Sequence, residues 1–397
     1  MNLDRILGQG HIKERIYDSI QKKNFPQSKI LVDKDDIKNI TNVVQRGMHW
    51  AEGPEIEEFE KTLAEYLGVD YCITMNSGTS ALHATMIAHD IRKNDEILVP
   101  SFTFVSTANA ALMVKAKPKF VDIETETYGM DPENLQKVIT KKSKLIMPVH
   151  YSGLPCKIDK IRTIAKQNKQ ILIEDSAESL GATINSKKIG SFGDASIFSF
   201  AGNKVLTTGE GGAVATNSSK LYKKCKLIRS HGRKIGNYFL STNKPEYMQL
   251  GYNWRMSTIT ATIGLSQLNK IEKLINLRRK NAKTLNSKLK KISEITLPPE
   301  PKNFKHVYQL YSILTPNQTL RNQLQKHLSE NGIMSKVFFY PVHLTQFHQK
   351  LKKYSNLKTT ENISSRILSL PMYPNMTNEE LKLIYETISA FFEKNWE

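Results

Sequence analysis

Short apolar runs alternate with amphipathic segments along the middle of the chain, from about residue 71 onward. The short runs have the length and the apolar or alternating character of strands, and the segments between them repeat apolar residues at helical spacing. The predicted strands are Tyr71 to Met75, Ile97 to Val99, Lys119 to Ile123, Leu145 to Val149, Ile171 to Glu174, Ser196 to Phe200 and Ala213 to Thr216. The predicted helices between them include Ser80 to Ala88, Pro132 to Ile139 and Ile158 to Gln167. This alternation predicts an α/β fold in which helices cover both faces of a mostly parallel, seven-stranded sheet.

Helical patterns also flank this region on both sides. Asp35 to Gln45 and Glu55 to Leu67 precede it, and Arg255 to Leu289 follows it as one long predicted helix with a broad apolar face. Beyond that helix, a small α+β layer is predicted from Tyr308 to Leu314, a helix from Leu320 to Asn331, the run from Lys336 to Tyr340 and a final helix from Asn378 to Phe392.

The chain length predicts more than one domain, because 397 residues exceed the size at which a single hydrophobic core keeps growing. We expect a large domain with an N-terminal arm over residues 31–280 and a smaller α+β domain over residues 281–397. Residues 1–30 are expected to form an N-terminal extension, whose role the sequence leaves open.

The composition is that of a globular protein with an excess of basic residues. No apolar run approaches the roughly 18 residues of a membrane span, and the charged N-terminus lacks a signal-peptide core, so we expect a cytoplasmic protein without a membrane partner. Cys72, Cys156 and Cys225 form no CxxC pair and are interpreted as free thiols in a reducing compartment. The net charge of +19 is typical of a lysine-rich composition or of an anionic ligand. Nucleic acid is the third interpretation, but no zinc-finger spacing or aromatic RNA-binding motif occurs, so no nucleic-acid partner is expected.

Polar groups follow several predicted strands, at the edge where parallel sheets bind ligands. Gly78, Thr79 and Ser80 stand at the start of a helix, where free N–H groups and hydroxyls can bind an anion; a simple helix N-cap is the alternative. Phe104 follows the second strand and can either lie flat on a planar ring or pack in the core. Asp175 follows the fifth strand and can either pair with a protonated ring nitrogen or cap a helix.

Lys204 lies in a turn after the run that ends at Phe200 and before a glycine-rich loop. A lysine amine is a nucleophile when it is unprotonated and held near a carbonyl group, and a crowded, partly dehydrated turn lowers its pKa. The alternative is a solvated surface lysine. An anion site, a flat aromatic ring, an acid and a lysine, each after a different strand, are the groups that pyridoxal 5'-phosphate (PLP) requires. No metal site is expected, because the spacing of His343 and His348 matches no standard site.

Six motifs occur in order along the chain. They are Gly53-Pro54-Glu55-Ile56-Glu57-Glu58-Phe59-Glu60, Asn76-Ser77-Gly78-Thr79-Ser80-Ala81-Leu82-His83, Pro100-Ser101-Phe102-Thr103-Phe104, Glu174-Asp175-Ser176-Ala177-Glu178, Gly202-Asn203-Lys204 with Thr207-Thr208-Gly209-Glu210-Gly211-Gly212, and Gly251-Tyr252-Asn253-Trp254-Arg255-Met256. With these motifs the chain, from about residue 30 to its C-terminus, resembles the DegT/DnrJ/EryC1/StrS family of sugar aminotransferases. The resemblance implies a PLP-dependent transferase of fold type I.

The resemblance also assigns roles to matching residues. Lys204 matches the lysine that bonds to the cofactor aldehyde and then moves a proton between substrate and cofactor carbons, and Asp175 matches the partner of the pyridine nitrogen. The phosphate contacts match Gly78, Thr79, Ser80 and Ser199, the ring-stacking position is Phe104, and the small residue under the other face of the ring is Ala177. Because some relatives carry histidine instead of the lysine and catalyse dehydration, Lys204 predicts a transaminase.

Two further positions follow from the same resemblance. Glu178 stands where relatives often have His or Gln, near the phenolic oxygen of the cofactor. Two anions would repel each other there, so either one proton is shared or Glu178 turns toward the substrate amine, and its role stays open. Asn253 matches a residue that reaches the cofactor phosphate of the neighbouring subunit, which implies a homodimer with shared active sites.

The loop after Lys204 is similar to that of the C4 aminases of 4-keto-6-deoxy sugars, including perosamine synthases. The resemblance therefore predicts amino transfer from L-glutamate to the C4 ketone of a nucleotide-linked 4-keto-6-deoxy sugar. A C3 aminotransferase or another PLP-dependent sugar-modifying enzyme is one alternative, and a non-catalytic regulatory or nucleic-acid-binding protein is another. Arg229, His231 and Arg233 are candidates for binding the nucleotide diphosphate. Residues 230–249 are expected to form a mobile loop near the substrate entrance, and Tyr340 to Leu344 resembles the family segment that borders the sugar pocket.

Overall fold

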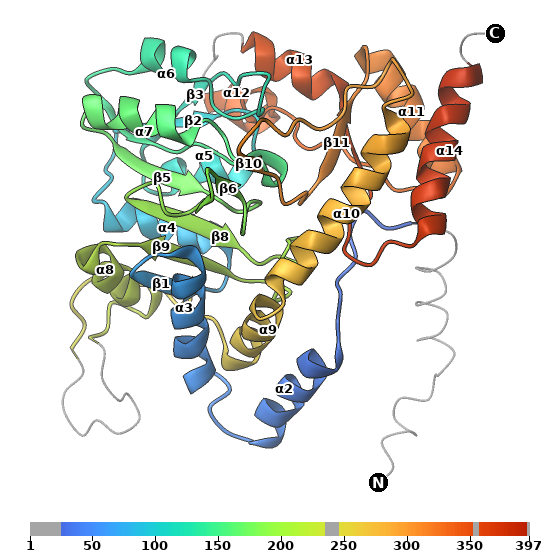
Figure 1. Cartoon of the computed structure of the whole chain (residues 1–397). Helices are drawn as coiled ribbons and strands as arrows, with labels where there is room; N and C mark the ends of the chain where they lie inside the picture. Colours follow the sequence, from blue (N-terminus) through green and yellow to red (C-terminus); the bar gives the residue numbers. More distant parts are fainter. Residues whose placement is uncertain (1–24, 235–245, 352–356, 395–397) are drawn as a thin grey trace.

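A seven-stranded sheet forms the centre of the molecule (Figure 1). The structure is a computed structural model, and it describes residues 25–234, 246–351 and 357–394. The strand order is β1-β9-β8-β5-β4-β2-β3. These strands are β1 (Tyr71–Met75), β2 (Glu96–Pro100), β3 (Lys117–Val121), β4 (Ser143–Ile146), β5 (Ile171–Asp175), β8 (Ala195–Ser199) and β9 (Gly212–Thr216). All seven predicted strands are present, and no strand end is shifted by more than three residues.

Most neighbouring strands in this sheet are parallel, as the sequence predicts. The pairs β2–β3, β2–β4, β4–β5 and β5–β8 are parallel, and only β9 runs antiparallel to its two neighbours, β1 and β8. Because β9 reverses direction between β1 and β8, the carboxyl ends of all strands except β9 meet at one edge. A ligand that binds this sheet is expected at that edge.

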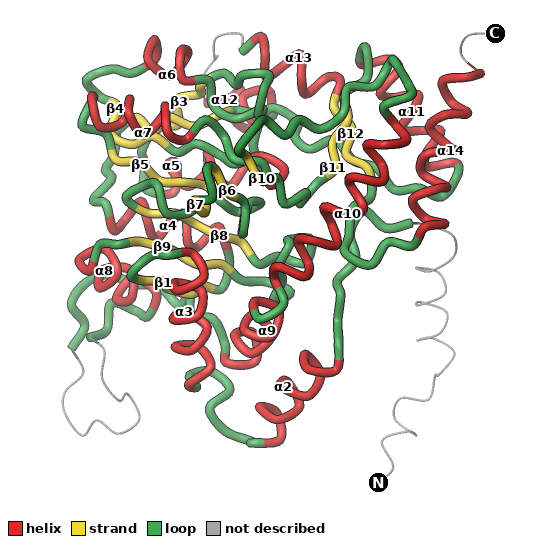
Figure 2. Tube along the Cα trace, viewed as in Figure 1, coloured by secondary structure: helices red, strands yellow, loops and turns green. Residues whose placement is uncertain are grey.

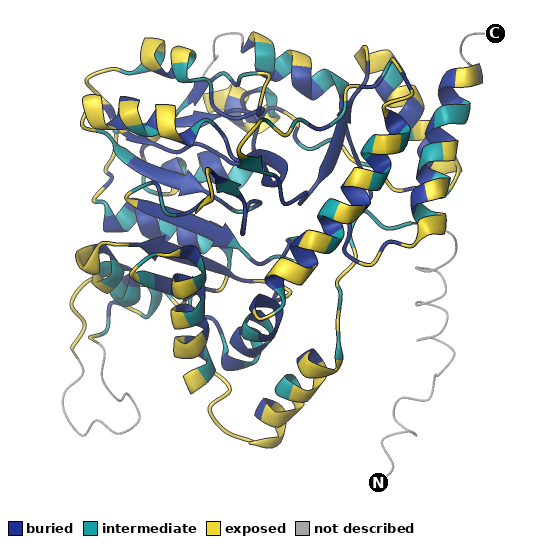
Figure 3. Ribbon diagram, viewed as in Figure 1, coloured by how far each residue is buried: buried dark blue, intermediate teal, exposed yellow. Residues whose placement is uncertain are grey.

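Helices cover both faces of the sheet, because its strands alternate apolar side chains between two cores. One core joins α3 (Pro54–Leu67), α7 (Ile158–Gln167) and α9 (Thr258–Leu268) to one face, and the other joins α4 (Gly78–Ala88), α5 (Val105–Met113) and α8 (Ser219–Arg229) to the opposite face. Along β5, for example, Leu172 belongs to the first core and Ile173 to the second. The strands are accordingly the most buried part of the molecule (Figure 3).

The long helix predicted from Arg255 to Leu289 is in fact two helices. α9 ends at Leu268, and α10 (Ile271–Leu289) begins after Asn269 and Lys270. The Lys270 ammonium lies 2.7 Å from Asp33 Oδ2 and 2.5 Å from Asp36 Oδ2, which fixes the break against α2 (Lys34–Gln45). A long-range ion pair of this kind leaves no mark in the apolar periodicity, which continues across the break.

The C-terminal part of the chain packs around a core of its own. This core contains the second half of α10, β11 (Tyr311–Leu314), β12 (Ile367–Leu370), α11 (Gln318–Glu330) and α14 (Asn378–Lys394). β11 and β12 lie side by side as an antiparallel pair (Figure 2). The boundary predicted between residues 280 and 281 falls inside α10, whose Ile275 packs under the large sheet and whose Leu285 packs in the C-terminal core. The division into domains stays a prediction.

Shorter elements complete the described chain. They are α6 (Pro132–Val138), β6 (Thr183–Ile184), β7 (Lys187–Lys188), β10 (Phe304–Lys305), α12 (Gln346–Leu351), α13 (Lys358–Arg366) and the 3₁₀ turns at Tyr151–Gly153 and Val342–Leu344. No helix in the described part of the chain is both long and apolar enough to cross a lipid bilayer. Most of the predicted N-terminal extension, residues 1–24, and the centre of the predicted entrance loop, residues 235–245, lie outside the described residues.

Candidate active site

A cavity of about 450 Å³ opens at the edge where the carboxyl ends of the strands meet. Its volume lies in the range of small-molecule sites. The predicted site residues that line it are Gly78, Thr79, Phe104, Asp175, Ala177, Glu178, Ser199 and Lys204. Ser80 and Asn253 are not among the lining residues. The topology therefore brings together eight of the ten predicted positions, which come from four different strand ends and the turn after β8.

Lys204 lies in the loop that connects β8 to β9. The two ends of this loop are held by hydrogen bonds from Phe200 N to Gly211 O, at 2.8 Å, and from Thr208 N to Phe200 O, at 2.9 Å. The Lys204 side chain is only 15% exposed, and its Nζ lies 3.4 Å from Glu178 Oε1. The interpretation of Lys204 as a solvated surface lysine is therefore wrong, because its amine points into the cavity and faces a carboxylate.

The backbone next to Lys204 is also held from the C-terminal part of the chain. The side-chain amide of Gln309 donates a hydrogen bond from Nε2 to Asn203 O, at 2.5 Å. Gln309 is buried, so this contact is shielded from water. Gln309 was not predicted as a site residue, because a single glutamine more than one hundred residues from the lysine carries no local signal.

Asp175 ends β5 with its carboxylate directed at α5. Its Oδ2 accepts a hydrogen bond from Thr107 Oγ1, at 2.7 Å, and its Oδ1 accepts one from Ala177 N, at 3.2 Å. Burial raises the pKa of Asp175, and the Thr107 and Ala177 hydrogen bonds and the Lys204 charge offset this effect only in part. A carboxylate in this setting gains from a cationic partner, such as a protonated ring nitrogen.

Glu178 connects Lys204 to the turn at Tyr151–Gly153. Its Oε1 faces the Lys204 ammonium, and its Oε2 accepts a hydrogen bond from Ser152 N, at 2.8 Å. Ser152 adopts a left-handed conformation with φ of 63°, which directs this N–H at Glu178. The two contacts hold the Glu178 side chain with one oxygen toward the lysine, so Glu178 and Lys204 lie at the same end of the cavity.

The start of α4 forms another end of the cavity. Gly78 and Thr79 open this helix, whose N-cap Ser77 accepts a hydrogen bond from Ser80 N. A Cβ atom on Gly78 would come within 2.9 Å of Ser199 Cβ, so the close approach of α4 to β8 requires glycine. The free N–H groups of this helix start, with the Thr79 and Ser199 hydroxyls, suit a phosphate group.

Ser80 makes its hydrogen bonds within the cap of α4. Its hydroxyl donates to Asn76 Oδ1, at 2.6 Å, and lies 2.8 Å from Ser77 Oγ. These two contacts belong to the helix cap. The role of Ser80 as a phosphate contact stays a prediction.

Phe104 stands at the cavity wall with 60% of its surface exposed. The alternative interpretation, that this ring packs in the core, is therefore wrong. Its nearest aromatic neighbour across the wall is Phe339, at 6.3 Å between ring centroids. An exposed ring beside a cavity is available to stack on a planar ligand.

Taken together, the lining residues fit PLP. An amine, a buried carboxylate with a raised pKa, a helix start that excludes side chains, and an exposed aromatic ring all face one cavity of sufficient volume. Lys204 would hold the aldehyde carbon, Asp175 the pyridine nitrogen, and Gly78, Thr79 and Ser199 the phosphate.

Three lining residues come from the C-terminal part of the chain and were missed. They are Lys336, Phe338 and Phe339. The backbone of Lys336 pairs with Ser369 on β12, and Phe338 O accepts a hydrogen bond from the Tyr151 hydroxyl, at 2.5 Å. The segment is an irregular wall of the cavity, in place of the strand-like run that the sequence suggests. Only tertiary contacts place it there, so its sequence carried no signal.

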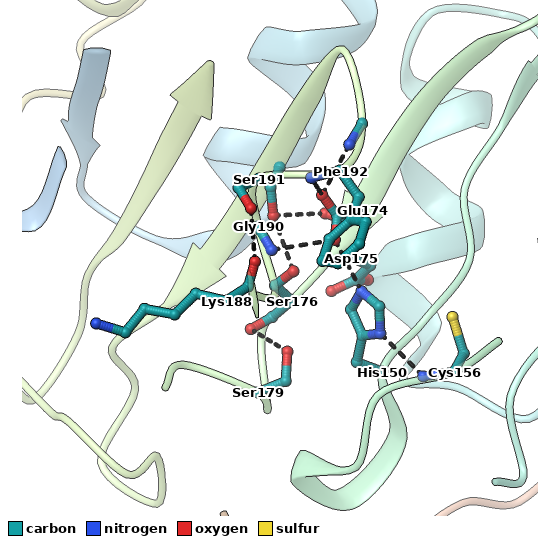
Figure 4. A network of polar contacts seen from close by, with 12 residues as sticks. His150, Cys156, Glu174, Asp175, Ser176, Ser179, Lys188, Gly190, Ser191 and Phe192 are labelled. Carbon is teal, nitrogen blue, oxygen red and sulfur yellow. Dashed lines mark hydrogen bonds and ion pairs between the residues drawn. The ribbon is translucent and has the colours of Figure 1, made fainter. Parts of the chain in front are cut away.

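The polar network around Glu174 lies directly beside the site (Figure 4). Glu174 Oε1 accepts hydrogen bonds from Phe192 N and Gly193 N, and Oε2 accepts one from Gly190 N, at 2.8, 2.9 and 3.0 Å. Oε2 also lies 3.2 Å from His150 Nε2. Burial raises the pKa of Glu174, but these contacts outweigh it and hold that pKa below the ordinary value. Glu174 therefore fixes the loop after β7 to the end of β5.

The basic residues proposed for the nucleotide diphosphate lie outside this cavity. Arg229 and Arg233 line a second cavity of about 400 Å³. The Arg229 guanidinium pairs with Glu60 and donates to Thr74 O, at 2.9 Å. His231 lines neither of the two cavities. In this single chain Arg229 therefore serves a buried ion pair.

His343 and His348 have separate partners. His343 Nδ1 lies 2.7 Å from Ser101 Oγ and its Nε2 lies 3.2 Å from Glu361 Oε1, whereas His348 Nδ1 lies 2.8 Å from Thr345 Oγ1. Over the described ranges, no group of three or more His, Cys, Asp or Glu side chains is arranged to hold a metal ion. The His343 contacts join the loop after β2 to α13.

Comparison with known proteins gives a consistent set of relatives. The model of the DegT/DnrJ/EryC1/StrS aminotransferase family matches residues 31–389. The GDP-perosamine synthase of Escherichia coli O157:H7 is 36% identical over 342 residues, which are 86% of this chain and 91% of that protein. The GDP-perosamine synthase of Vibrio cholerae is 33% identical over 363 residues, which are 91% of this chain and 97% of that protein.

A solved structure shares the whole architecture. Helicobacter pylori PseC, an aminotransferase involved in the biosynthesis of pseudoaminic acid, aligns with a TM-score of 0.89 and 32% identity. The alignment covers 94% of this chain and 100% of that protein.

Proposed function

Because the chain belongs to the DegT/DnrJ/EryC1/StrS aminotransferase family of PLP-dependent enzymes, we propose that it aminates the C4 ketone of a nucleotide-linked 4-keto-6-deoxy sugar. L-glutamate is the amino donor in this proposal. The observation that carries it is the position of the Lys204 amine, which faces Glu178 at 3.4 Å in the same cavity as Asp175.

The choice of the C4 position is supported by the relatives. Proteins named GDP-perosamine synthase from three bacteria are 33% to 36% identical to this chain, and perosamine synthases aminate C4. The loop after Lys204, with the sequence Thr-Thr-Gly-Glu-Gly-Gly, also resembles that of C4 aminases of 4-keto-6-deoxy sugars.

Each residue of the cavity has a separate role in the proposed transamination. Bound PLP supplies an electron sink for the carbon from which a proton leaves. The Lys204 Nζ takes up and returns that proton, and Glu178, fixed by Ser152, holds the amine in place. Asp175 would stabilise a positive charge at the pyridine nitrogen, and Phe104 would orient the ring.

The proposal includes a homodimer in which Asn253 reaches the site of the partner. Asn253 is exposed and lies outside the cavity of its own chain. Large apolar side chains are exposed along the N-terminal arm, where Val32 is 59%, Ile37 61% and Trp50 47% exposed. Exposed apolar residues gathered on one arm are typical of a surface that a second subunit covers.

A cytoplasmic location is also part of the proposal. Cys72, Cys156 and Cys225 are all buried and free. Unpaired thiols are typical of proteins from a reducing compartment.

The test is incubation of the PLP-loaded enzyme with L-glutamate and a panel of nucleotide-linked 3-keto and 4-keto 6-deoxy sugars. Mass spectrometry detects the amino sugar, and NMR gives the carbon that carries the nitrogen. We expect amination at C4 and none when glutamate is omitted. Amination at C3, or of no 4-keto sugar in the panel, would contradict the proposal.

A further inference from the structure

We propose that Lys336 binds a carboxylate of the amino donor, an inference that rests on the proposed function. Of the residues that line the cavity, only Lys204 and Lys336 are basic, whereas Asp175, Glu178 and Glu210 are acidic. Among the side chains that this one chain contributes to the cavity, a donor with two carboxylates would meet more negative than positive charge. It therefore needs a cation that is not already paired.

The backbone of Lys336 is fixed on the small sheet. Lys336 N donates to Ser369 O, at 3.0 Å, and Ser369 N donates to Lys336 O, at 2.8 Å. Ser369 is fully buried in β12. These reciprocal bonds give Lys336 a rigid base, although the segment around it is irregular.

The wall beside Lys336 is equally well held. The Lys336 ammonium lies 5.0 Å from the centre of the Phe338 ring, a cation–π contact that directs the charge along the cavity wall. Phe338 O accepts a hydrogen bond from the Tyr151 hydroxyl, and Phe339 O accepts one from Ser364 Oγ, at 2.5 and 2.7 Å. The lysine side chain therefore projects from a preformed surface.

The charge of Lys336 is available to a ligand, whereas that of Lys204 is not. Lys204 faces Glu178 at 3.4 Å. Within residues 25–234, 246–351 and 357–394, no carboxylate forms an ion pair with the Lys336 ammonium, and Lys336 is an exposed residue of the cavity lining. An anionic group of a substrate would complete this site.

Two anionic groups could bind Lys336, the carboxylate of the amino acid and the diphosphate of the nucleotide sugar, and the positions of the reacting atoms distinguish them. In an amino acid, the α-carboxylate is attached to the same carbon as the reacting nitrogen, so it must enter the cavity that contains Lys204. In the nucleotide sugar, the diphosphate is attached to C1, across the pyranose ring from the C4 that reacts. Lys336 lines the cavity of Lys204 itself, which favours the carboxylate.

The experiment compares Lys336→Met and Lys336→Arg with the matched control Lys326→Met. Lys326 lies on α11 with 79% of its side chain exposed, and it lines none of the cavities described above. Each half-reaction of the PLP-loaded enzyme is followed separately through the absorbance of the cofactor, first with glutamate and then with the nucleotide sugar. Calorimetry measures the binding of succinate, a dicarboxylate that has no amino group to transfer.

We expect Lys336→Met to raise the glutamate concentration for half-maximal rate about 10-fold and to weaken succinate binding by a similar factor. Lys336→Arg is expected to stay within about threefold of the wild type because it keeps the charge. The sugar half-reaction and the control should not change. If Lys336→Met does not fold, Lys336→Gln replaces it.

Two outcomes would overturn the inference. A change in the sugar constant with unchanged glutamate and succinate constants would assign Lys336 to the diphosphate. No change in any constant would remove Lys336 from substrate binding altogether. If the wild type aminates no sugar, the proposed function fails, but the glutamate and succinate measurements still decide the role of Lys336.

Discussion

Glu174 and Asp175 are adjacent carboxylates at the end of β5 that belong to two different regions of the molecule. Because side chains alternate along a strand, Glu174 lies on the face of Leu172 and Asp175 on the face of Ile173. Glu174 therefore enters a closed polar network, and Asp175 enters the cavity. Both are buried, with exposures of 0% and 4%, so exposure does not separate them.

The number of hydrogen-bond donors separates them. Glu174 accepts hydrogen bonds from three backbone N–H groups and faces His150. Together these contacts occupy both carboxylate oxygens of Glu174 and hold the Glu174 pKa below the ordinary value. Asp175 receives only Thr107 Oγ1 and Ala177 N, and burial raises its pKa. A saturated buried carboxylate stabilises the fold, whereas an unsaturated one is available to a ligand.

The largest effect is expected from Lys204→Ala, on the cavity side of this comparison. Removal of the amine eliminates the group that moves the proton, so turnover should fall by about 10⁴-fold or more. The free energy of unfolding should change by only about 1–2 kcal/mol, because Glu178 keeps its bond from Ser152 and faces an open cavity. Turnover and urea unfolding are measured beside Lys220→Ala, an exposed lysine on α8. Retained transamination would refute the assignment of Lys204.

Asp175→Asn is expected to have the next largest effect. The amide cannot supply the negative charge for a pyridine nitrogen, so turnover should fall by about 10²- to 10³-fold. Because the folded pKa of Asp175 is raised, the stability that it contributes is present at low pH and is lost as the pH rises through that pKa. At pH 7 the variant without cofactor should therefore unfold at a urea concentration equal to or above that of the wild type. Wild-type turnover would show that Asp175 is as structural as Glu174.

Local sequence patterns predict most elements of the fold. The elements that they do not predict depend on long-range contacts. β1 is found at its predicted bounds, because five strand-forming residues end at the turn that starts α4. The break between α9 and α10 was not predicted, since Lys270 is fixed by Asp33 and Asp36, more than 230 residues away in the chain. The apolar spacing alone continues through it.

The site residues also include some that local patterns predict and some that only long-range contacts place. Asp175 and Lys204 were predictable because parallel strands bring their carboxyl ends to one edge. Lys336 was not, because hydrogen bonds between distant segments place its loop against the cavity. Glu174 carried a partial signal, since a glutamate in the apolar run Ile-Leu-Ile-Glu needs buried partners. Its donors lie 16 to 19 residues away along the chain, and no local pattern identifies them.

Glu174→Gln is expected to have the smallest effect of the three on turnover, and it should mainly lower the free energy of unfolding. Glutamine keeps one acceptor oxygen and places an NH₂ group where the carboxylate accepted N–H bonds, so donors would face donors. The cost should be about 2–3 kcal/mol in the free energy of unfolding at pH 7, measured by urea unfolding. The exposed Glu65→Gln is the control, with an expected change below about 0.5 kcal/mol.

The pH dependence of the stability difference between the wild type and Glu174→Gln tests whether the difference comes from the charge of Glu174. The folded pKa of Glu174 is lowered, so its stabilisation is present above the unfolded pKa of about 4.3 and is lost as the pH falls through the lower folded value. The gap in unfolding free energy between wild type and Glu174→Gln should therefore narrow when the measurement is repeated below pH 4. Equal stability at pH 7, or a gap that stays constant into acid, would mean that the network around Glu174 does not depend on its charge. The contrast with Asp175 would then rest on position alone.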